Sequence, residues 1–140
     1  MVDRLTIPRS VADELLDHAR TEVPNEACGL LAGDLAAGRA TAFHPARNEE
    51  ASPLRYNVHP DDLVRIIFGI EDAGEDLVGI FHSHTHTPAV PSATDLRTAQ
   101  YPDAFYVLVT LSDPNAGPAE SLRAWRIRGG VSTEVELLIE

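Results

Sequence analysis

The sequence predicts an α/β domain in which helices pack on a central mixed sheet, in a three-layer arrangement. Two nearly continuous apolar runs, 76–84 and 103–111, are typical of strands that are covered on both faces. Amphipathic helical segments alternate with these strands, as they do in α/β folds. The 140 residues contain neither a linker nor a repeat, so we expect one domain over 1–140.

The first part of the chain predicts a helix followed by a hairpin. The helix is expected over 9–22, with Ser10 as its cap and Pro24 after its end. Its apolar positions recur at helical spacing: Val11, Leu15, Leu16 and Ala19. Two short segments, 27–33 and 39–48, are separated by a glycine-bounded turn and read as antiparallel strands.

The second part predicts two further helices and four strands. A helix over 59–74 begins with two acidic residues in its first turn and ends at Gly74. The two apolar runs form the central strands, and a short helix over 92–100 lies between them. The chain closes with two alternating strands on either side of the pair Gly129 and Gly130, and Trp125 is expected in the core.

The charge and cysteine content exclude several classes of protein. All eleven basic residues are arginine and face 22 acidic residues, for a net charge of −11. The absence of lysine excludes Schiff-base catalysis and a P-loop, and the negative charge argues against nucleic acid or an anionic membrane as partner. The single cysteine, Cys28, excludes an intramolecular disulfide and CxxC metal sites, and favours a cytoplasmic location.

The most informative segment is GIFHSHTHTPAVPSATDL, which predicts a metal site. His82 and His84 are two residues apart in an expected strand, so their side chains point to the same side of the sheet. The prolines that follow turn the chain, and Asp95 can return to the strand end. Two imidazoles and one carboxylate predict one catalytic zinc ion per chain, with the fourth position open for water.

Two alternatives apply to the same residues. Ser92 and Asp95 form the pattern of a capping box, which requires no metal. His86 extends the histidine alternation, so a three-histidine site with His82 and His84 is a rival ligand set. Otherwise His86 lines the cleft or is exposed.

Together these residues resemble the signature of the JAMM (MPN+) zinc metallopeptidases, also called the JAB1/Mov34/PAD-1 family. That signature is a distant Glu, then HxH, seven residues and SxxD, and Glu26 in PNEACGLLAG fills the first position. The resemblance implies a JAB1/MPN domain of the cytidine-deaminase-like three-layer type. It also implies that His82, His84 and Asp95 bind zinc, that Glu26 is the general acid/base, and that Ser92 donates to the oxyanion.

Further segments, from HARTEVPNEACGLLAG to the final RIRGGV, resemble the short stand-alone bacterial members of this family. The resemblance implies hydrolysis of the amide bond after the Gly-Gly tail of a ubiquitin-like sulfur-carrier protein, with release of cysteine. A general deconjugase of ubiquitin-like modifiers and a non-catalytic MPN scaffold are the alternatives. A zinc nucleobase deaminase is excluded, because it needs a PCxxC ligand pair.

Several other residues admit two interpretations. Cys28 follows Glu26 by two positions, so it is either a redox-sensitive group lining the cleft or a small buried side chain. Asn48, Ser52 and Tyr56 belong to a segment that could form a flap over the cleft or a plain connecting loop. The sequence leaves the oligomeric state open.

Overall fold

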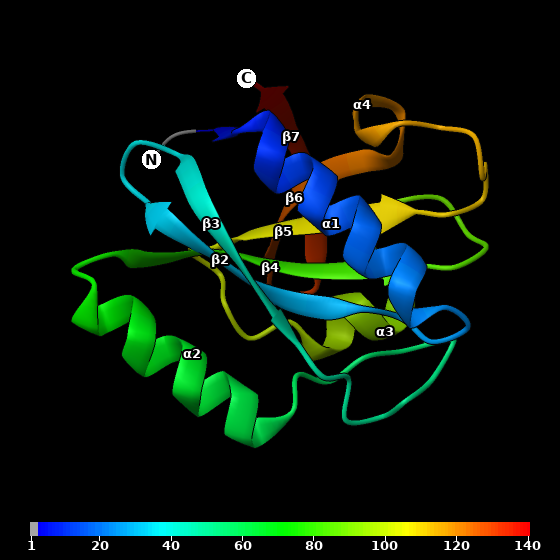
Figure 1. The fold of residues 1–140 in the computed structure, drawn as a ribbon, viewed down its shortest axis with the longest axis horizontal. Coiled ribbons are helices and arrows are strands. Elements are labelled where there is room, and N and C mark those ends of the chain that lie inside the picture. Colours follow the sequence, from blue (N-terminus) through cyan, green and yellow to red (C-terminus); the bar gives the residue numbers. More distant parts are fainter. Residues whose placement is uncertain (1–2) are drawn as a thin grey trace.

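The computed structural model describes residues 3–140, and its seven strands form one mixed sheet that closes on itself (Figure 1). The strands are β1 (Arg4–Ile7), β2 (Cys28–Asp34), β3 (Arg39–Ala46), β4 (Asp76–His84), β5 (Phe105–Thr110), β6 (Leu122–Arg128) and β7 (Val131–Ile139). The helices are α1 (Arg9–Glu22), α2 (Pro60–Asp72), α3 (Ala93–Thr98) and α4 (Pro118–Ser121).

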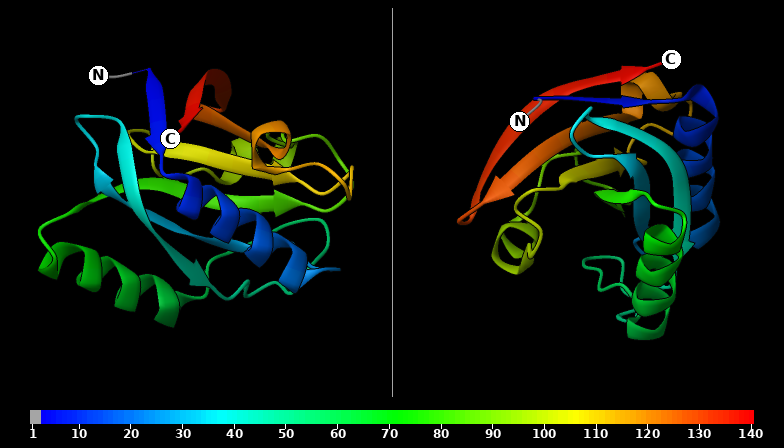
Figure 2. Two further views of the ribbon diagram at one scale, coloured as in Figure 1. Left: turned by 45° about the horizontal axis from the view of Figure 1, so that its top comes forward. Right: turned by 90° about the vertical axis from the view of Figure 1, so that its left-hand side faces the viewer.

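The strand order around the sheet is β1-β3-β2-β4-β5-β6-β7, and β1 completes the ring. It pairs in parallel with β7 from Arg4 to Ile7, but it meets β3 at a single pair, Thr6 and Arg39. The strong curvature of the sheet is visible end-on (Figure 2). The predicted mixed sheet with helices packed on it is therefore confirmed, whereas the three-layer, cytidine-deaminase-like description is not.

The two apolar runs form neighbouring central strands, as predicted. β4 and β5 run in parallel, with Gly79 opposite Phe105 and His84 opposite Thr110. On its other side β4 pairs antiparallel with β2, so that Cys28 lies opposite His82. The start of β2 therefore lies beside the histidine-bearing end of β4, which brings Glu26 to the same place.

The sheet buries a separate apolar cluster on each face. α1 packs on one face, where its buried residues are the predicted Val11, Leu15, Leu16 and Ala19, together with Ala12. α2 packs on the other face through Ile66 and Ile70, close to the buried Trp125 that the sequence predicted. Figure 2 shows α1 and α2 lying apart along the curved sheet. Both faces of β4 and β5 are thus covered, which explains their unbroken apolar sequence.

Three local features differ from the sequence predictions. The helix α1 begins after Pro8 without a side-chain cap, so the prediction that Ser10 caps it is wrong. The short elements β1 and α4 were not predicted, because four residues are too few to show the spacing of apolar residues that marks a strand or a helix. β1 exists through its pairing with the distant β7, which local sequence does not reveal. Within residues 3–140, no helix has the length and apolar character that crossing a membrane requires.

Candidate metal centre and active site

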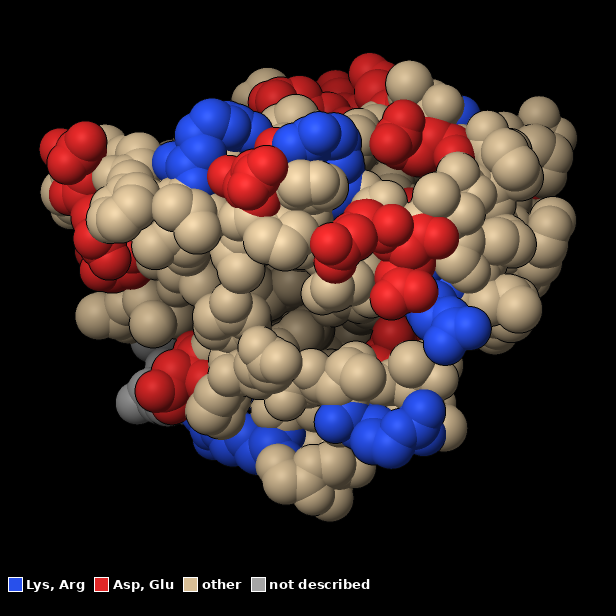
Figure 3. Space-filling model, turned by 90° about the horizontal axis from the view of Figure 1, so that it is seen from below, with Lys and Arg blue, Asp and Glu red and all other residues tan. Residues whose placement is uncertain are grey.

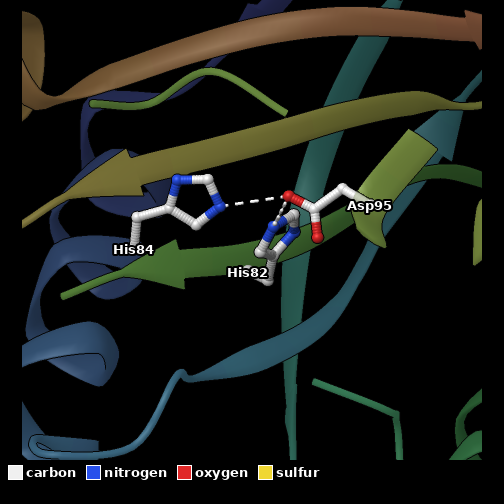
Figure 4. Close-up of side chains that lie close together, drawn as sticks. All are labelled: His82, His84 and Asp95. Carbon is white, nitrogen blue, oxygen red and sulfur yellow. Dashed lines mark hydrogen bonds and ion pairs between the residues drawn. The ribbon is translucent and has the colours of Figure 1, made fainter. Parts of the chain in front are cut away.

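Three buried side chains converge at the end of β4 (Figure 4). Oδ2 of Asp95 lies 3.0 Å from Nε2 of His82 and 3.1 Å from Nε2 of His84. The three candidate ligand atoms all lie within 4.8 Å of one another. The structure thus brings together the two imidazoles and the carboxylate that the sequence predicted as a ligand set.

The loop between the histidines and Asp95 is anchored at three points. Nδ1 of His84 lies 2.8 Å from the carbonyl oxygen of Pro88, which fixes this nitrogen as a donor and leaves Nε2 free to bind a metal. Oγ1 of Thr110 donates to the Thr87 carbonyl at 2.7 Å, and Nε1 of Trp125 donates to the Ala89 carbonyl at 3.0 Å. The returning chain is therefore held by the neighbouring strands β5 and β6.

The capping box that the sequence offered as an alternative is present, and it serves the same site. Ser92 is the N-cap of α3, and its Oγ accepts a 3.0 Å hydrogen bond from the Asp95 amide. The Ser92 amide donates to Oδ2 of Asp95 at 2.9 Å. The capping geometry thus holds Asp95 in the orientation that places its carboxylate between the histidines.

The charges of these groups are strongly coupled. Burial raises the pKa of Asp95, but hydrogen bonds from His82 and His84 outweigh it, so the pKa falls below its usual range. Burial lowers the pKa of His82. Burial also opposes protonation of His84, but its bonds to Asp95 and Pro88 prevail and raise its pKa. A cation at this position would replace the protons that now satisfy the carboxylate.

Glu26 is buried beside this group with one oxygen unpaired. Its Oε1 and Nδ1 of His82 are buried polar atoms that have no hydrogen-bond partner among residues 3–140. Burial raises the pKa of Glu26 to about 7, while His84 lowers it and Asp95 raises it. Because an unpaired buried carboxylate oxygen is costly, the site suits an additional polar occupant such as a water molecule beside a cation.

The segment after β3 holds the backbone of Glu26 on both sides. Nδ2 of Asn48 donates to the Glu26 carbonyl at 3.0 Å, and the Glu26 amide donates to the Ser52 carbonyl at 2.8 Å. The ring of Tyr56 stacks on His82, with centroids 4.2 Å apart and an interplanar angle of 17°. All three residues of the segment that the sequence singled out therefore contact the site.

His86 and Cys28 lie outside the cluster of candidate ligand atoms. His86 is exposed, and it is not part of the ligand group found among residues 3–140. Cys28 is fully buried, with its Sγ 3.5 Å from the Arg47 carbonyl oxygen. Burial, with smaller contributions from nearby carboxylates, raises the pKa of its thiol to about 12, so the reactive thiolate is suppressed.

Two contacts near the site were not anticipated from the sequence. Oγ of Ser83, the residue between the two histidines, accepts a 2.8 Å hydrogen bond from the Ala27 amide. Asp62 at the start of α2 accepts from the amide and guanidinium of Arg47, next to Asn48. Its position in the first helical turn indicated only a favourable interaction with the helix dipole.

A cavity of about 400 Å³ adjoins the cluster. Tyr56, which stacks on His82, and Thr94, which precedes Asp95, both line it. Its lining combines buried apolar side chains, such as Leu30 and Ile80, with polar ones that include two arginines and Glu50. Neither His86 nor Cys28 lines this cavity. Figure 3 shows the underside of the molecule, which is hollowed near its middle and carries basic groups among many acidic ones.

Known proteins are similar to this chain over most of its length. A family model described as prokaryotic homologs of the JAB domain matches residues 8–128. The chain is 41% identical over 130 residues to the CysO-cysteine peptidase of Mycobacterium tuberculosis, covering 93% of this chain and 87% of that protein. It is 42% identical over 110 residues to the desampylase of Haloferax volcanii, covering 75% of this chain and 79% of that protein. A solution structure from Desulfitobacterium hafniense superposes with a TM-score of 0.86 at 30% identity, covering 97% of this chain and 92% of that one.

Proposed function

Because this chain belongs to the prokaryotic JAB-domain family, we propose that it hydrolyses the amide bond after the C-terminal tail of a ubiquitin-like sulfur-carrier protein. The relative named CysO-cysteine peptidase supports cysteine as the residue released. The observation that carries the proposal is the buried convergence of His82, His84 and Asp95 beside Glu26. Hydrolysis of an amide needs a polarised carbonyl and a carboxylate that moves one proton, and this site can provide both.

Zinc is the metal we propose for this site. Two imidazole nitrogens and one carboxylate oxygen form a typical donor set for catalytic zinc, and unpaired Oε1 of Glu26 leaves room for a polar neighbour. When bound, zinc lowers the pKa of water and polarises a carbonyl group. His82, His84 and Asp95 would hold it, with His84 oriented by the Pro88 carbonyl.

Glu26 is the proposed general base and acid. Its pKa of about 7 allows the carboxylate to accept a proton from the attacking water near neutral pH. The water oxygen forms a bond to the scissile carbonyl carbon, and the bond from that carbon to the amide nitrogen then breaks. Glu26 returns the proton to the departing nitrogen, so that a free amine leaves and the carboxyl end stays with the carrier.

Ser92 is the proposed donor to the carbonyl oxygen. Its Oγ already accepts a hydrogen bond from the Asp95 amide, so its own hydrogen remains available to donate. Such a hydrogen bond strengthens as negative charge develops on the substrate oxygen. The capping role and the catalytic role are therefore compatible in one side chain.

A general deconjugase is the second candidate, and the similarity to a desampylase favours it. The two functions differ in the leaving group, which is a single amino acid in one case and a protein lysine in the other. We also propose a cytoplasmic location, supported by the buried Cys28, which is a free thiol and not part of a disulfide.

The test is to incubate the zinc-loaded protein with two substrates and to follow cleavage by mass spectrometry. One is a ubiquitin-like carrier joined through its Gly-Gly tail to cysteine, and the other is a lysine-linked carrier conjugate. Release of cysteine that is lost on chelation and in Glu26→Gln supports the proposal. Cleavage of the lysine-linked conjugate alone would replace it with the general deconjugase, and cleavage of neither would refute both.

A further inference from the structure

We infer that Tyr56 is a positioning residue for the candidate ligand His82, and that its ring fixes the plane of this imidazole by stacking on it. This inference rests on the proposed function and deepens it, because it concerns how one of the proposed zinc ligands is held ready for the metal. Tyr56 lies in the segment between β3 and α2. It is neither a candidate ligand nor a group in the proposed proton transfer.

The two candidate histidine ligands are held in different ways. A histidine that binds a metal usually donates its other ring nitrogen to a hydrogen bond, which sets the orientation of the ring. His84 follows this pattern, because its Nδ1 lies 2.8 Å from the Pro88 carbonyl oxygen. Nδ1 of His82 is buried and has no hydrogen-bond partner among residues 3–140. The contact of its Nε2 with Asp95 would be replaced by a bound metal, so another group has to hold the imidazole of His82.

The ring of Tyr56 is placed to do this. The two rings are nearly parallel, with centroids 4.2 Å apart and an interplanar angle of 17°. Rotation of the imidazole about its Cβ–Cγ bond would drive its edge into the face of the tyrosine ring. Aromatic pairs in contact also contribute favourable energy beyond the area that they bury. The stack therefore sets the ring plane of His82 without a hydrogen bond.

Tyr56 is itself held through its two neighbours by Asn48. Nδ2 of Asn48 donates to the Arg55 carbonyl at 3.0 Å, and Oδ1 of Asn48 accepts from the Asn57 amide at 3.0 Å. The same Nδ2 donates to the Glu26 carbonyl at 3.0 Å. One carboxamide thus ties the residues before and after Tyr56 to the backbone of the proposed general base. The stacked ring and Glu26 therefore share one support.

The ring also separates His82 from the cavity beside it. Tyr56 lines this cavity, whereas His82 is fully buried and does not line it. A smaller aliphatic side chain at position 56 would leave space next to the imidazole. Water entering that space could bond to the unpaired Nδ1 of His82, and the ring could turn. A flat side chain at position 56 prevents both.

Zinc affinity tests the positioning role separately from turnover. The dissociation constant is measured by competition with a chromogenic chelator, in the wild type and in three variants. Tyr56→Leu removes the ring and should raise the constant about three- to tenfold, as expected for the loss of an aromatic pair. Tyr56→Phe keeps the ring face and should bind zinc as the wild type does. The matched control, Tyr101→Leu, removes a ring that lines the same cavity but does not stack on His82, and should leave the affinity unchanged.

Proton NMR of the metal-free wild type tests the stack without any variant. The face of an aromatic ring shields the nuclei above it. The carbon-bound ring protons of His82 should therefore resonate upfield of those of the exposed His86. Protons of His82 at ordinary frequencies would overturn the inference. So would a Tyr56→Leu protein that melts at a lower temperature but binds zinc with wild-type affinity, because the ring would then serve the fold alone.

Kinetics at saturating zinc separate a positioning role from contact with the substrate. Tyr56→Leu should lower kcat for the carrier–cysteine adduct about tenfold with KM unchanged, since the ring acts through a ligand. A change confined to KM would overturn the inference while leaving the peptidase function intact. Zinc affinities and NMR shifts that follow the expected pattern, in a protein that cleaves no adduct, would support the positioning role and refute the function.

Discussion

The side chain of Ser83 accepts a 2.8 Å hydrogen bond from the amide of Ala27, across the junction of β4 and β2. The Ser83 amide in turn donates to the Ala27 carbonyl at 3.0 Å. Because side chains alternate along a strand, Ser83 points away from the face that carries His82 and His84. The residue between the two histidines thus secures the backbone next to Glu26, and so positions the proposed general base relative to the candidate ligands.

We expect Ser83→Ala to reduce the free energy of unfolding by about 1–3 kcal/mol, because it leaves the buried Ala27 amide without its acceptor. Urea denaturation measures the loss, and hydrogen exchange at the Ala27 amide should accelerate. Ser112→Ala, which alters an exposed serine, is the matched control. Unchanged exchange at Ala27 would show that the hydrogen bond contributes nothing.

Asp95→Ala should abolish most zinc binding, while His86→Ala should preserve it. Asp95 provides the carboxylate between both histidines, whereas His86 is exposed and outside the ligand group. The measurement is metal content after dialysis against micromolar zinc. Retention by Asp95→Ala together with loss in His86→Ala would establish the three-histidine site instead.

Glu26→Gln should keep both the fold and zinc, but lose activity by about 10²- to 10⁴-fold. The amide has the shape of the carboxylate but cannot accept and return a proton. Zinc content and circular dichroism check the first expectation, and cleavage of the carrier–cysteine adduct checks the second. Near-normal turnover would remove Glu26 from the mechanism.

Ser92→Ala should have a milder effect on rate than Glu26→Gln and a small effect on stability. Loss of one oxyanion donor costs about a hundredfold in kcat, and loss of a helix cap costs about 1 kcal/mol. Comparison of kcat with thermal melting separates the two roles. A variant that loses stability but keeps kcat would show that Ser92 acts as a cap alone.

Asp62→Asn should destabilise the protein by about 1–2 kcal/mol near pH 7, because charged hydrogen bonds to Arg47 are lost at a partly solvated site. These bonds, with that of the Arg47 backbone, hold the pKa of Asp62 well below its usual 3.8. A lowered pKa stabilises the fold above the unfolded value, and this contribution is lost as the pH falls through the folded value. The difference between wild type and Asp62→Asn should therefore stay constant from neutral pH to about pH 5 and shrink below about pH 4.

Urea denaturation of both proteins over this pH range is the measurement. Asp61→Asn, at an exposed position in the same helical turn, is the control. If the difference persists unchanged at low pH, ionisation of Asp62 does not contribute to stability.

The sequence by itself determined the central elements and the candidate ligands. Continuous apolar runs identified β4 and β5. A strand that is buried on both faces has no polar face, so its sequence does not alternate between apolar and polar residues. Alternation alone placed His82 and His84 on one side of β4. Local patterns also predicted α1, α2 and the hairpin of β2 and β3. The spacing of apolar residues and the turn residues that indicate these elements lie within each segment.

The tertiary structure alone decided which distant residues meet. The pairing of Cys28 with His82 brings Glu26 close to the candidate metal ligands, and the contact of Ser83 with Ala27 secures it. Packing between distant segments also stacks the ring of Tyr56 on His82. The closure of the sheet likewise depends on a distant contact, because β1 pairs with β7 at the other end of the chain. Local sequence carries no signal for these contacts, because they depend on strand register and packing between segments far apart in the chain.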